Sequence, residues 1–290
     1  MKQSLIQLHI SVLLAGFTGI LGVFIQLNEL PLVWYRMGIT AITLLIILLW
    51  RKQTFAITPR NILFFLGIGV LIALHWVFFY ASIKLANVSI GLVCFAATSF
   101  FTAVLEPLFN RKKAHAVEVG LGLLSLLGIY IIFQFDVKFR TGILFGLGSA
   151  LIAALFSIFN KKNIHKAATQ TIMLIEMTGG FLLLTILLPF YLQQNPTAKW
   201  IPTMPDLFWL LILAWLCTVL AMELMLKALR NISAFTQNLT LNLEPVYGIL
   251  LAFVLFHENK YLNSSFYWGI FCIALSVIIQ MRRVTKLYHT

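Results

Sequence analysis

Long apolar runs, separated by short polar links, follow one another along the whole chain. Each run is close to the roughly 20 residues that a helix needs to cross a bilayer. None alternates with the two-residue period of a β-barrel strand. The pattern predicts an all-α integral membrane protein with ten transmembrane helices. The expected spans are approximately 4–26, 31–50, 61–83, 87–109, 115–134, 141–160, 168–191, 206–226, 232–256 and 266–281.

Composition agrees with a chain whose main solvent is lipid. Hydrophobic residues make up 61% and charged residues 10%, against about 45–50% and about 25% in soluble domains. The first run is longer than the apolar region of a signal peptide and is interpreted as an uncleaved span. The three cysteines fall in separate runs without metal or disulfide spacing, so neither a metal nor a cofactor is expected. No phosphate-binding loop indicates ATP-driven chemistry.

Basic residues are distributed unevenly between alternate links. With a cytoplasmic N-terminus, the cytoplasmic links hold 15 of the 21 Lys and Arg residues, and the external links hold 5. The positive-inside rule then places both termini in the cytoplasm. We expect a multi-pass protein of the cytoplasmic (inner) membrane of a bacterium. The cations are scattered in twos and threes, which argues against a nucleic-acid partner.

A short internal match indicates a repeat. The segment "LANVS" (Leu85–Ser89) and the segment "LRNIS" (Leu229–Ser233) lie 144 residues apart, about half the chain, and each precedes a closely following span. Five spans per half is an odd number, so the second half must enter the membrane from the opposite side. The prediction is a five-plus-five inverted repeat with domains 1–135 and 141–290, an arrangement common among secondary transporters.

The ninth expected span contains Glu244 followed by Pro245. Proline removes a backbone donor and should bend the helix. A carboxylate at the bilayer centre costs about 2.5–3.5 kcal/mol, so Glu244 should face protein or water. One arc of this helix carries Gln237, Thr240, Glu244 and Tyr247, and the opposite arc carries Asn238 and Asn242. Either arc would line a cavity while the other bonds a neighbour; the Glu244 arc is favoured. The alternative is that Glu244 only hydrogen-bonds across the bundle.

The fourth expected span carries a polar stripe of Thr98, Ser99, Thr102 and Glu106. The stripe fits a translocation path, but hydroxyl groups also mediate helix packing in membranes. The two interpretations of Thr98 and Thr102 remain open. Glu106 lies one turn from the basic link 111–113 and is expected to form an interfacial ion pair.

Other charges lie at membrane depth. Arg36 is about 8 Å into the second span at 1.5 Å per residue, where it would attract an anionic substrate group or pair with Glu29. Glu176 has no obvious local partner. Glu223 is expected to pair with Lys227 at i,i+4.

The third span contains His75, Trp76 and Tyr80. Histidine is rare at membrane depth and often functional there, although a buried histidine can also serve packing alone. Trp76 and Tyr80 each combine a large apolar face with one polar group, and they suit a site for a partly apolar solute.

The order of these features resembles the drug/metabolite transporter superfamily, with its EamA-type branch the most similar. The resemblance rests on the five-plus-five spans, on Arg36, and on three stretches: "GILFGLGSALIAALFSIFNKK", "LCTVLAMELMLKALRNISA" and "NLEPVYGILLAFVLFHE". It implies export of small metabolites or amino acids from a central cavity lined mainly by the third, fourth, eighth and ninth spans. The family usually has a proline in the middle of the fourth span, near Thr98–Thr102, where this chain has none.

The predicted function is therefore secondary export by alternating access. Proton coupling through Glu244, with Glu176 as the second candidate, is one hypothesis. A facilitated uniporter or an importer is the alternative, and a membrane enzyme or scaffold is a remote one, because no catalytic set converges at one depth. The expected partners are a small-molecule substrate and the lipid bilayer, with the protein a monomer or homodimer. The residues leave the substrate, the direction of transport and the coupling ion open.

Overall fold

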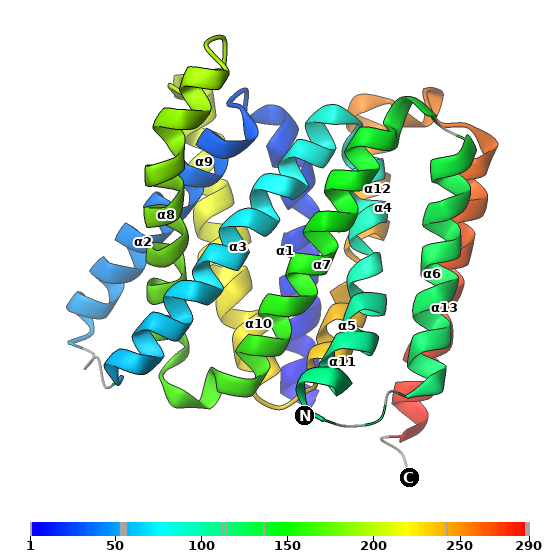
Figure 1. Ribbon diagram of the computed structural model, residues 1–290, viewed down its shortest axis with the longest axis horizontal. Coiled ribbons are helices and arrows are strands. Elements are labelled where there is room, and N and C mark those ends of the chain that lie inside the picture. Colours follow the sequence, from blue (N-terminus) through cyan, green and yellow to red (C-terminus); the bar gives the residue numbers. More distant parts are fainter. Residues whose placement is uncertain are drawn as a thin grey trace.

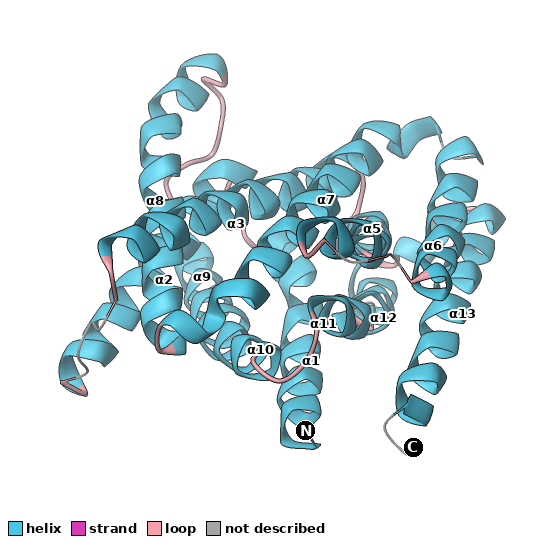
Figure 2. Ribbon diagram, turned by 60° about the horizontal axis from the view of Figure 1, so that its bottom comes forward, coloured by secondary structure: helices cyan, strands magenta, loops and turns pink. Residues whose placement is uncertain are grey.

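A computed structural model describes residues 2–52, 57–111, 113, 115–135, 137–241 and 243–287. These residues form helices joined by short loops, with no strand among them (Figures 1 and 2). The α-helices are α1 (Lys2–Phe24), α2 (Glu29–Trp50), α3 (Pro59–Leu85), α4 (Val88–Phe95), α5 (Ala97–Phe109), α6 (Ala116–Phe135), α7 (Arg140–Asn163), α8 (Thr169–Gln194), α9 (Met204–Ala214), α10 (Ala221–Leu229), α11 (Ala234–Leu241), α12 (Glu244–Phe256) and α13 (Ser264–Leu287). Short turns are η1 (Val137–Phe139), η2 (Ile164–Lys166), the π turn η3 (Trp215–Leu220) and η4 (Glu258–Lys260).

Seven helical segments of the described chain are long and apolar enough to cross a membrane. They are Gln3–Phe24, Glu29–Trp50, Pro59–Leu85, Val88–Phe109, Arg140–Lys166, Thr169–Gln194 and Met204–Leu229. Three shorter apolar helices cover Ala116–Ile132, Glu244–Phe256 and Ser264–Ser276. Large apolar side chains also point outward, among them Ile46, Leu49, Ile186 and Phe190, each at least 60% exposed. Such a surface is suited to lipid, and the predicted all-helical, multi-pass membrane fold is confirmed.

Three of the expected spans are interrupted near the middle of the bundle. The ninth divides into α11 and α12, and Pro245 lies in the first turn of α12, where its missing N–H costs no helical hydrogen bond. The eighth contains the π turn between α9 and α10. The fourth divides into α4 and α5 at Ala96, although no proline is present there. The hydroxyl groups of Thr98 and Ser99 donate to the carbonyl oxygens of Phe95 (2.6 Å) and Ala96 (3.0 Å), which satisfies backbone acceptors at this break.

The two spans that divide into half-helices pack against each other. α4 contacts α12, and α5 contacts α11. The first half of the fourth expected span therefore lies beside the second half of the ninth, so the two spans run antiparallel. The start of α1 and the end of α13 lie at the same end of the bundle, at the bottom of Figure 1.

Small residues allow neighbouring helices to approach each other closely. A Cβ atom on Gly69 of α3 would overlap the backbone of Glu176 in α8, and one on Gly179 would overlap the backbone of Leu66. At the other side of the molecule α6 and α13 pair (Figure 1), where the hydroxyl groups of Ser125 and Ser276 are 2.7 Å apart. Close approach through glycine and serine is the usual means of helix association in membranes.

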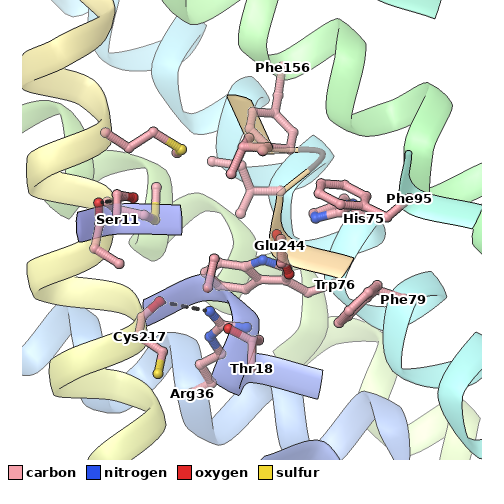
Figure 3. A pocket seen from close by; sticks show the side chains of 16 residues that line it. Ser11, Thr18, Arg36, His75, Trp76, Phe79, Phe95, Phe156, Cys217 and Glu244 are labelled. Carbon is pink, nitrogen blue, oxygen red and sulfur yellow. Dashed lines mark hydrogen bonds between the residues drawn. The ribbon is translucent and has the colours of Figure 1, made fainter. Parts of the chain in front are cut away.

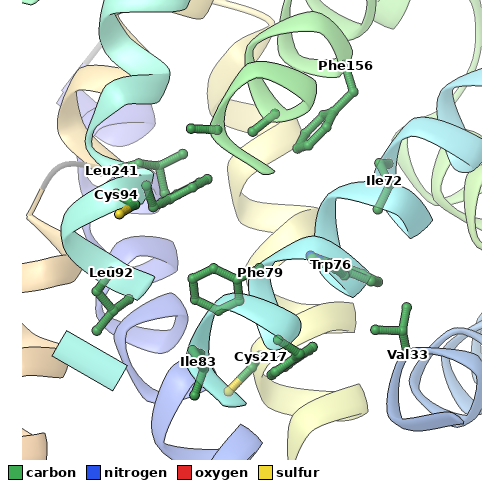
Figure 4. Close-up of a cluster of buried hydrophobic side chains, with 14 of the residues drawn as sticks. Val33, Ile72, Trp76, Phe79, Ile83, Leu92, Cys94, Phe156, Cys217 and Leu241 are labelled. Atoms are coloured by element: carbon green, nitrogen blue, oxygen red, sulfur yellow. The ribbon is translucent and has the colours of Figure 1, made fainter. Parts of the chain in front are cut away.

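The core lies where α3 crosses the middle of the bundle. Side chains of α3, α4 and α7 meet there with residues of α2, the π turn and α11 (Figure 4). Figure 4 labels Val33, Ile72, Trp76, Phe79, Ile83, Leu92, Cys94, Phe156, Cys217 and Leu241 in this cluster. The helices that the core holds together are the ones that surround the central cavity.

Candidate functional site

A cavity of about 90 Å³ lies at the centre of the bundle (Figure 3). Its walls come from α1, α2, α3, α4, α7, the π turn, α10, α11 and α12, so it is assembled from both halves of the chain. The polar side chains that line it are Ser11, Thr18, Arg36, His75 and Glu244, with Cys217 beside them. The apolar walls are Ala15, Ile72, Trp76, Phe79, Phe95, Phe156, Ala221, Met222, Met225 and Leu241.

Arg36 is 2% exposed and is fixed by neutral groups. Its Nε atom donates to the Thr218 hydroxyl (2.8 Å), Nη1 donates to the Tyr80 hydroxyl (3.2 Å), and Nη2 donates to the carbonyl oxygen of Cys217 (3.3 Å). Its guanidinium carbon lies 3.6 Å from the centre of the Trp76 ring, within cation–π distance. The guanidinium group is therefore held in one orientation at the cavity wall without a carboxylate neutralising it.

The π turn explains why the eighth span can bind Arg36. The Thr218 hydroxyl donates to the carbonyl oxygen of Leu213, five residues earlier, at 2.8 Å. Widening of the helix here leaves the Cys217 carbonyl oxygen able to accept from Arg36. Single π turns inside α-helices are frequent at functional sites.

Glu244 supplies the opposite charge. It lies in the first turn of α12, just after the break in the ninth span, and is 5% exposed. No contact within 4.0 Å joins its carboxylate to Arg36 in the described structure, although the two interact electrostatically. In the view of Figure 3 they lie on opposite sides of Trp76. The cavity thus presents a cation and a carboxylate that do not pair directly with each other.

His75 is fixed from the α7 side. Its Nδ1 atom lies 3.0 Å from the carbonyl oxygen of Ser149 and 2.7 Å from the Ser149 hydroxyl oxygen. Its ring also lies 5.3 Å from the Phe95 ring and 5.4 Å from the Phe156 ring, centre to centre. His75 therefore packs against neighbouring rings and also lines the cavity, so its functional role stays a prediction.

Three predicted residues of the third and fourth spans lie outside the lining. Tyr80 is fully buried and reaches the site only through Arg36. Thr98, for which a translocation path and helix packing were both open, does not line the cavity, and its hydroxyl group donates to the carbonyl oxygen of Phe95. Thr102 donates to the carbonyl oxygen of Thr98 (2.7 Å) and accepts from the Asn238 amide (2.8 Å). The hydroxyl stripe thus follows the helix-packing interpretation in this conformation.

Of the favoured arc of the ninth span, only Glu244 lines the cavity. Gln237 is buried in α11 and its Oε1 atom has no hydrogen-bond partner among the residues that the structure describes, while Thr240 donates to the carbonyl oxygen of Thr236. Tyr247 is 38% exposed on the outer side of α12. On the opposite arc Asn238 bonds neighbouring helices, and Asn242 lies outside the described residues. The break between α11 and α12 separates the two halves of the arc, so a continuous helical wheel no longer applies.

Glu176 lies away from the cavity. Its side chain is 0% exposed, and neither carboxylate oxygen has a hydrogen-bond partner in the described structure, although Asn160 is nearby. Glu29 accepts from the Tyr191 hydroxyl (2.7 Å) and does not contact Arg36. The predicted pair of Glu223 with Lys227 is confirmed at 2.6 Å.

The expected ion pair of Glu106 with the basic link is wrong for the residues described. Glu106 contacts neither Arg111 nor Lys113 as an ion pair, and Lys112 lies outside the described residues. The carboxylate instead accepts from the backbone N–H of Phe235 (3.0 Å) at the start of α11. An orphan helix N-terminus binds the carboxylate in place of a side-chain cation.

Several lining residues were not among those predicted. Ser11 and Thr18 are seven residues apart on α1 and share one face, a spacing that the sequence alone contains. Cys217 and the Arg36 partner Thr218 depend on the π turn, for which the sequence carries no clear signal. Among the described residues no group of three or more His, Cys, Asp or Glu side chains is placed to hold a metal ion.

Known proteins with related sequences agree with this architecture. The EamA-like transporter family matches residues 3–134 and, a second time, residues 140–282. The chain belongs to the EamA-like transporter family. This membership confirms the resemblance to drug/metabolite transporters and indicates membrane transport in general, which favours a transporter over an enzyme.

Individual proteins extend this comparison. An uncharacterized transporter of Haemophilus influenzae (strain ATCC 51907 / DSM 11121 / KW20 / Rd) is 24% identical over 268 residues, which cover 87% of this EamA-like chain and 85% of the relative. A chain of known crystal structure superposes with a TM-score of 0.70 at 12% identity. That alignment covers 94% of this EamA-like chain and 95% of the other, and shows a shared fold.

Proposed function

We propose that this EamA-like protein is a secondary transporter that exports small metabolites or amino acids across the cytoplasmic membrane by alternating access. The observation that carries the proposal is the central cavity, where Arg36 and Glu244 carry opposite charges without contacting each other. A zwitterionic solute can place its carboxylate at Arg36 and its ammonium group at Glu244. The Trp76 face and the Met and Phe walls accommodate an apolar side chain.

The cavity must change shape for transport to occur. A volume of about 90 Å³ accommodates only a few water molecules, each of which occupies about 30 Å³ in the liquid. An amino acid with an apolar side chain is larger, so binding requires the surrounding helices to separate. The interruptions of the fourth, eighth and ninth spans border the cavity and supply places for such movement.

An inverted repeat of five plus five spans gives the movement a symmetric basis. The family matches twice, in ranges close to the proposed repeats 1–135 and 141–290. Helix contacts also exchange under the proposed two-fold axis. The α3–α7 contact corresponds to α1–α10, and the α4–α7 contact corresponds to α1–α11. The antiparallel α4–α12 and α5–α11 contacts map onto each other. These relations support ten spans in two inverted halves.

The basic residues support an orientation with both termini in the cytoplasm, as the positive-inside rule indicates. Export from that side requires the cavity to open first toward the termini. Proton coupling through Glu244 gives the export its direction: the carboxyl group binds a proton in one access state and releases it in the other. Glu176 is the second candidate carrier, and transport without coupling, as a uniporter or importer, is the alternative.

The test is transport by purified protein in liposomes with labelled leucine, methionine and phenylalanine. We expect uptake of the labelled amino acid to respond to an imposed proton gradient and to fall when the same amino acid is added without the label. Analogues that lack either the carboxylate or the ammonium group should compete poorly, because each leaves one charge of the cavity without a partner. Absence of transport for amino acids and for other small zwitterions would contradict the proposal.

Glu244→Gln separates coupling from transport. The amide keeps the size of the side chain but cannot carry a proton, so we expect loss of the response to the gradient. Exchange of substrate should remain, at lower affinity, because the amide oxygen can still accept from the substrate ammonium group but no longer offers it a charge. Glu176→Gln is the matched control, because it changes another buried carboxyl group that does not line the cavity. If Glu176→Gln abolished the response and Glu244→Gln did not, the carrier would be Glu176.

A further inference from the structure

A second, larger pocket lies outside the transport path, at the end of the bundle that carries the termini. Its volume is about 760 Å³, and it lies between the start of α3, the end of α5 and the end of α7 with η2. Its cationic side chains are Arg60, Lys162 and Lys166. The described part of the chain contributes no Asp or Glu to its lining.

The three cations are free of carboxylate partners. None of them takes part in an ion pair among the described residues, and all three are exposed. The Lys166 ammonium group instead lies 5.8 Å from the centre of the Phe64 ring. Their positive charge is therefore available to an anion from outside the chain.

The start of α3 adds to this positive field. The Thr58 side chain makes no capping hydrogen bond, and the first turn of the helix contains no acidic residue. Pro59 has no N–H, and the N–H groups of Asn61 and Ile62 donate to the Thr58 carbonyl oxygen, so it is mainly the helix dipole that favours an anion at this terminus. The start of α9 provides a contrast within the same chain: there Thr203 and Asp206 form a capping box. The position three residues after Thr58 is Asn61, a neutral side chain that lines the pocket.

Apolar side chains continue the pocket toward the membrane. Leu63 is 73% exposed, Phe64 37% and Phe109 38%, and all three line it. The pocket thus combines cations at one level with exposed apolar surface beside them on membrane-spanning helices. A free inorganic anion would use only the first feature, whereas a phospholipid uses both.

We infer that this pocket binds an anionic phospholipid. The headgroup phosphate lies among Arg60, Lys162, Lys166 and the start of α3, and an acyl chain covers Leu63, Phe64 and Phe109. Basic pockets between transmembrane helices on the cytoplasmic side are suited to anionic headgroups. The inference concerns a site separate from the central cavity and does not depend on which solute is transported.

The experiment measures lipid retained by the purified protein, with native mass spectrometry and titration in mixed micelles, using phosphatidylglycerol and phosphatidylcholine. The triple variant Arg60→Gln, Lys162→Gln, Lys166→Gln should weaken phosphatidylglycerol binding roughly a hundredfold, at about fivefold per cation. The matched control is Arg51→Gln, Lys52→Gln, Lys113→Gln, which removes equal charge from exposed residues outside the pocket. It should retain the lipid.

A single substitution tests the same site in case the triple variant fails to fold. Asn61→Asp gives α3 the acidic residue that α9 has in Asp206, so it should stabilise the helix start and still repel a phosphate, lowering lipid affinity about tenfold. If the triple variant of the pocket and the control triple variant lost phosphatidylglycerol to the same extent, the pocket would not be the binding site. If inorganic phosphate alone displaced phosphatidylglycerol from the pocket, the ligand would be a free anion and the phospholipid would be ruled out. Unchanged binding in Asn61→Asp would remove the start of α3 from the site.

Discussion

Arg36 is the most constrained charged residue of the cavity. A buried cation normally needs a paired anion, yet every described hydrogen bond of Arg36 goes to a hydroxyl or carbonyl oxygen. Neutral acceptors fix the guanidinium group without cancelling its charge. A positive charge that is held and not neutralised is suited to a substrate carboxylate, which two parallel N–H groups can bind.

We predict that Arg36→Lys lowers the affinity for a zwitterionic substrate by roughly tenfold or more. The charge remains, but a lysine ammonium cannot reproduce the contacts with Thr218 and Cys217 or stack on Trp76 in the same plane. Binding is measured by titration calorimetry or by the ligand-induced shift in melting temperature. Arg230→Lys is the control, since Arg230 bonds Thr169 and the carbonyl oxygen of Ala167 away from the cavity. Equal affinity in wild type and Arg36→Lys would show that Arg36 is structural.

Whether the sequence can identify a polar residue of the site depends on the free-energy cost of placing that residue in the membrane. Arg36, His75 and Glu244 could be identified from sequence because ionisable groups at membrane depth are costly and need a purpose. Ser11 and Thr18 could not, because small hydroxyl residues are equally useful for helix packing. Thr98 shows the same ambiguity: its sequence position fitted both a translocation path and helix packing, and in the structure its hydroxyl group donates to a backbone carbonyl oxygen.

At the scale of elements, the two half-helix spans cap each other. Glu258, after α12, accepts from the N–H groups of Val88 (3.0 Å) and Ser89 (2.9 Å) and from the Ser89 hydroxyl (2.5 Å) at the start of α4. Glu106, in α5, accepts from the N–H of Phe235 (3.0 Å) at the start of α11. Each span therefore supplies a carboxylate to the N-terminus of the other. The two contacts lie at opposite ends of the bundle, since α4 starts at the top and α11 at the bottom of Figure 1.

This reciprocity leads to the prediction that each carboxylate holds one end of the transporter closed. Hydrogen bonds to a charged group contribute about 1.5–3 kcal/mol, so removing one should favour opening of that end about tenfold or more. Cys217 lines the cavity and is a natural reporter once Cys94 and Cys272 are replaced by alanine. Glu258→Ala should accelerate its labelling by an impermeant thiol reagent from the side opposite the termini. Glu106→Ala should do so from the side of the termini.

Two matched controls remove carboxylates that do not join these spans. Glu29→Ala acts at the end opposite the termini, where Glu29 bonds Tyr191, and Glu223→Ala acts at the other end, where Glu223 pairs with Lys227. Neither should change the labelling rate of Cys217. If both capping variants labelled at the wild-type rate from both sides, the carboxylates would be permanent helix caps and not closing contacts.

The elements also show what sequence can predict about breaks in a span. Pro245 indicated the interruption of the ninth span because a missing N–H is a local property. The break at Ala96 and the π turn at Trp215–Leu220 were not predicted. The hydroxyl groups at the Ala96 break are local in sequence, but hydroxyl residues are equally common in unbroken membrane helices, so they did not indicate a break. The π turn is stabilised by contact with the Arg36 side chain, which comes from another helix. Expected span boundaries, in contrast, lie close to the observed helices because lipid imposes apolarity over a fixed length.

For the whole molecule, the basic residues support the proposed orientation in the membrane, and the two family matches with the helix contacts support the proposed repeat. In an inverted repeat a rotation exchanges both the two halves and the two sides of the membrane, so the repeat alone gives such a transporter no preferred orientation. The direction in which it sits, and so the side from which substrate first enters, depends on the asymmetric cations in the links.

The last prediction tests this orientation directly. In a variant without native cysteines, Lys260→Cys should react with an impermeant maleimide in intact cells, because η4 lies at the end opposite the termini. Lys52→Cys, between α2 and α3, should react only after the cells are lysed. Both positions are exposed, so a difference in labelling reports the membrane side and not burial. Labelling of Lys52→Cys in intact cells, with Lys260→Cys protected, would reverse the orientation. In that event Glu106 would hold the external end and Glu258 the cytoplasmic end, and the cavity would load from the opposite side.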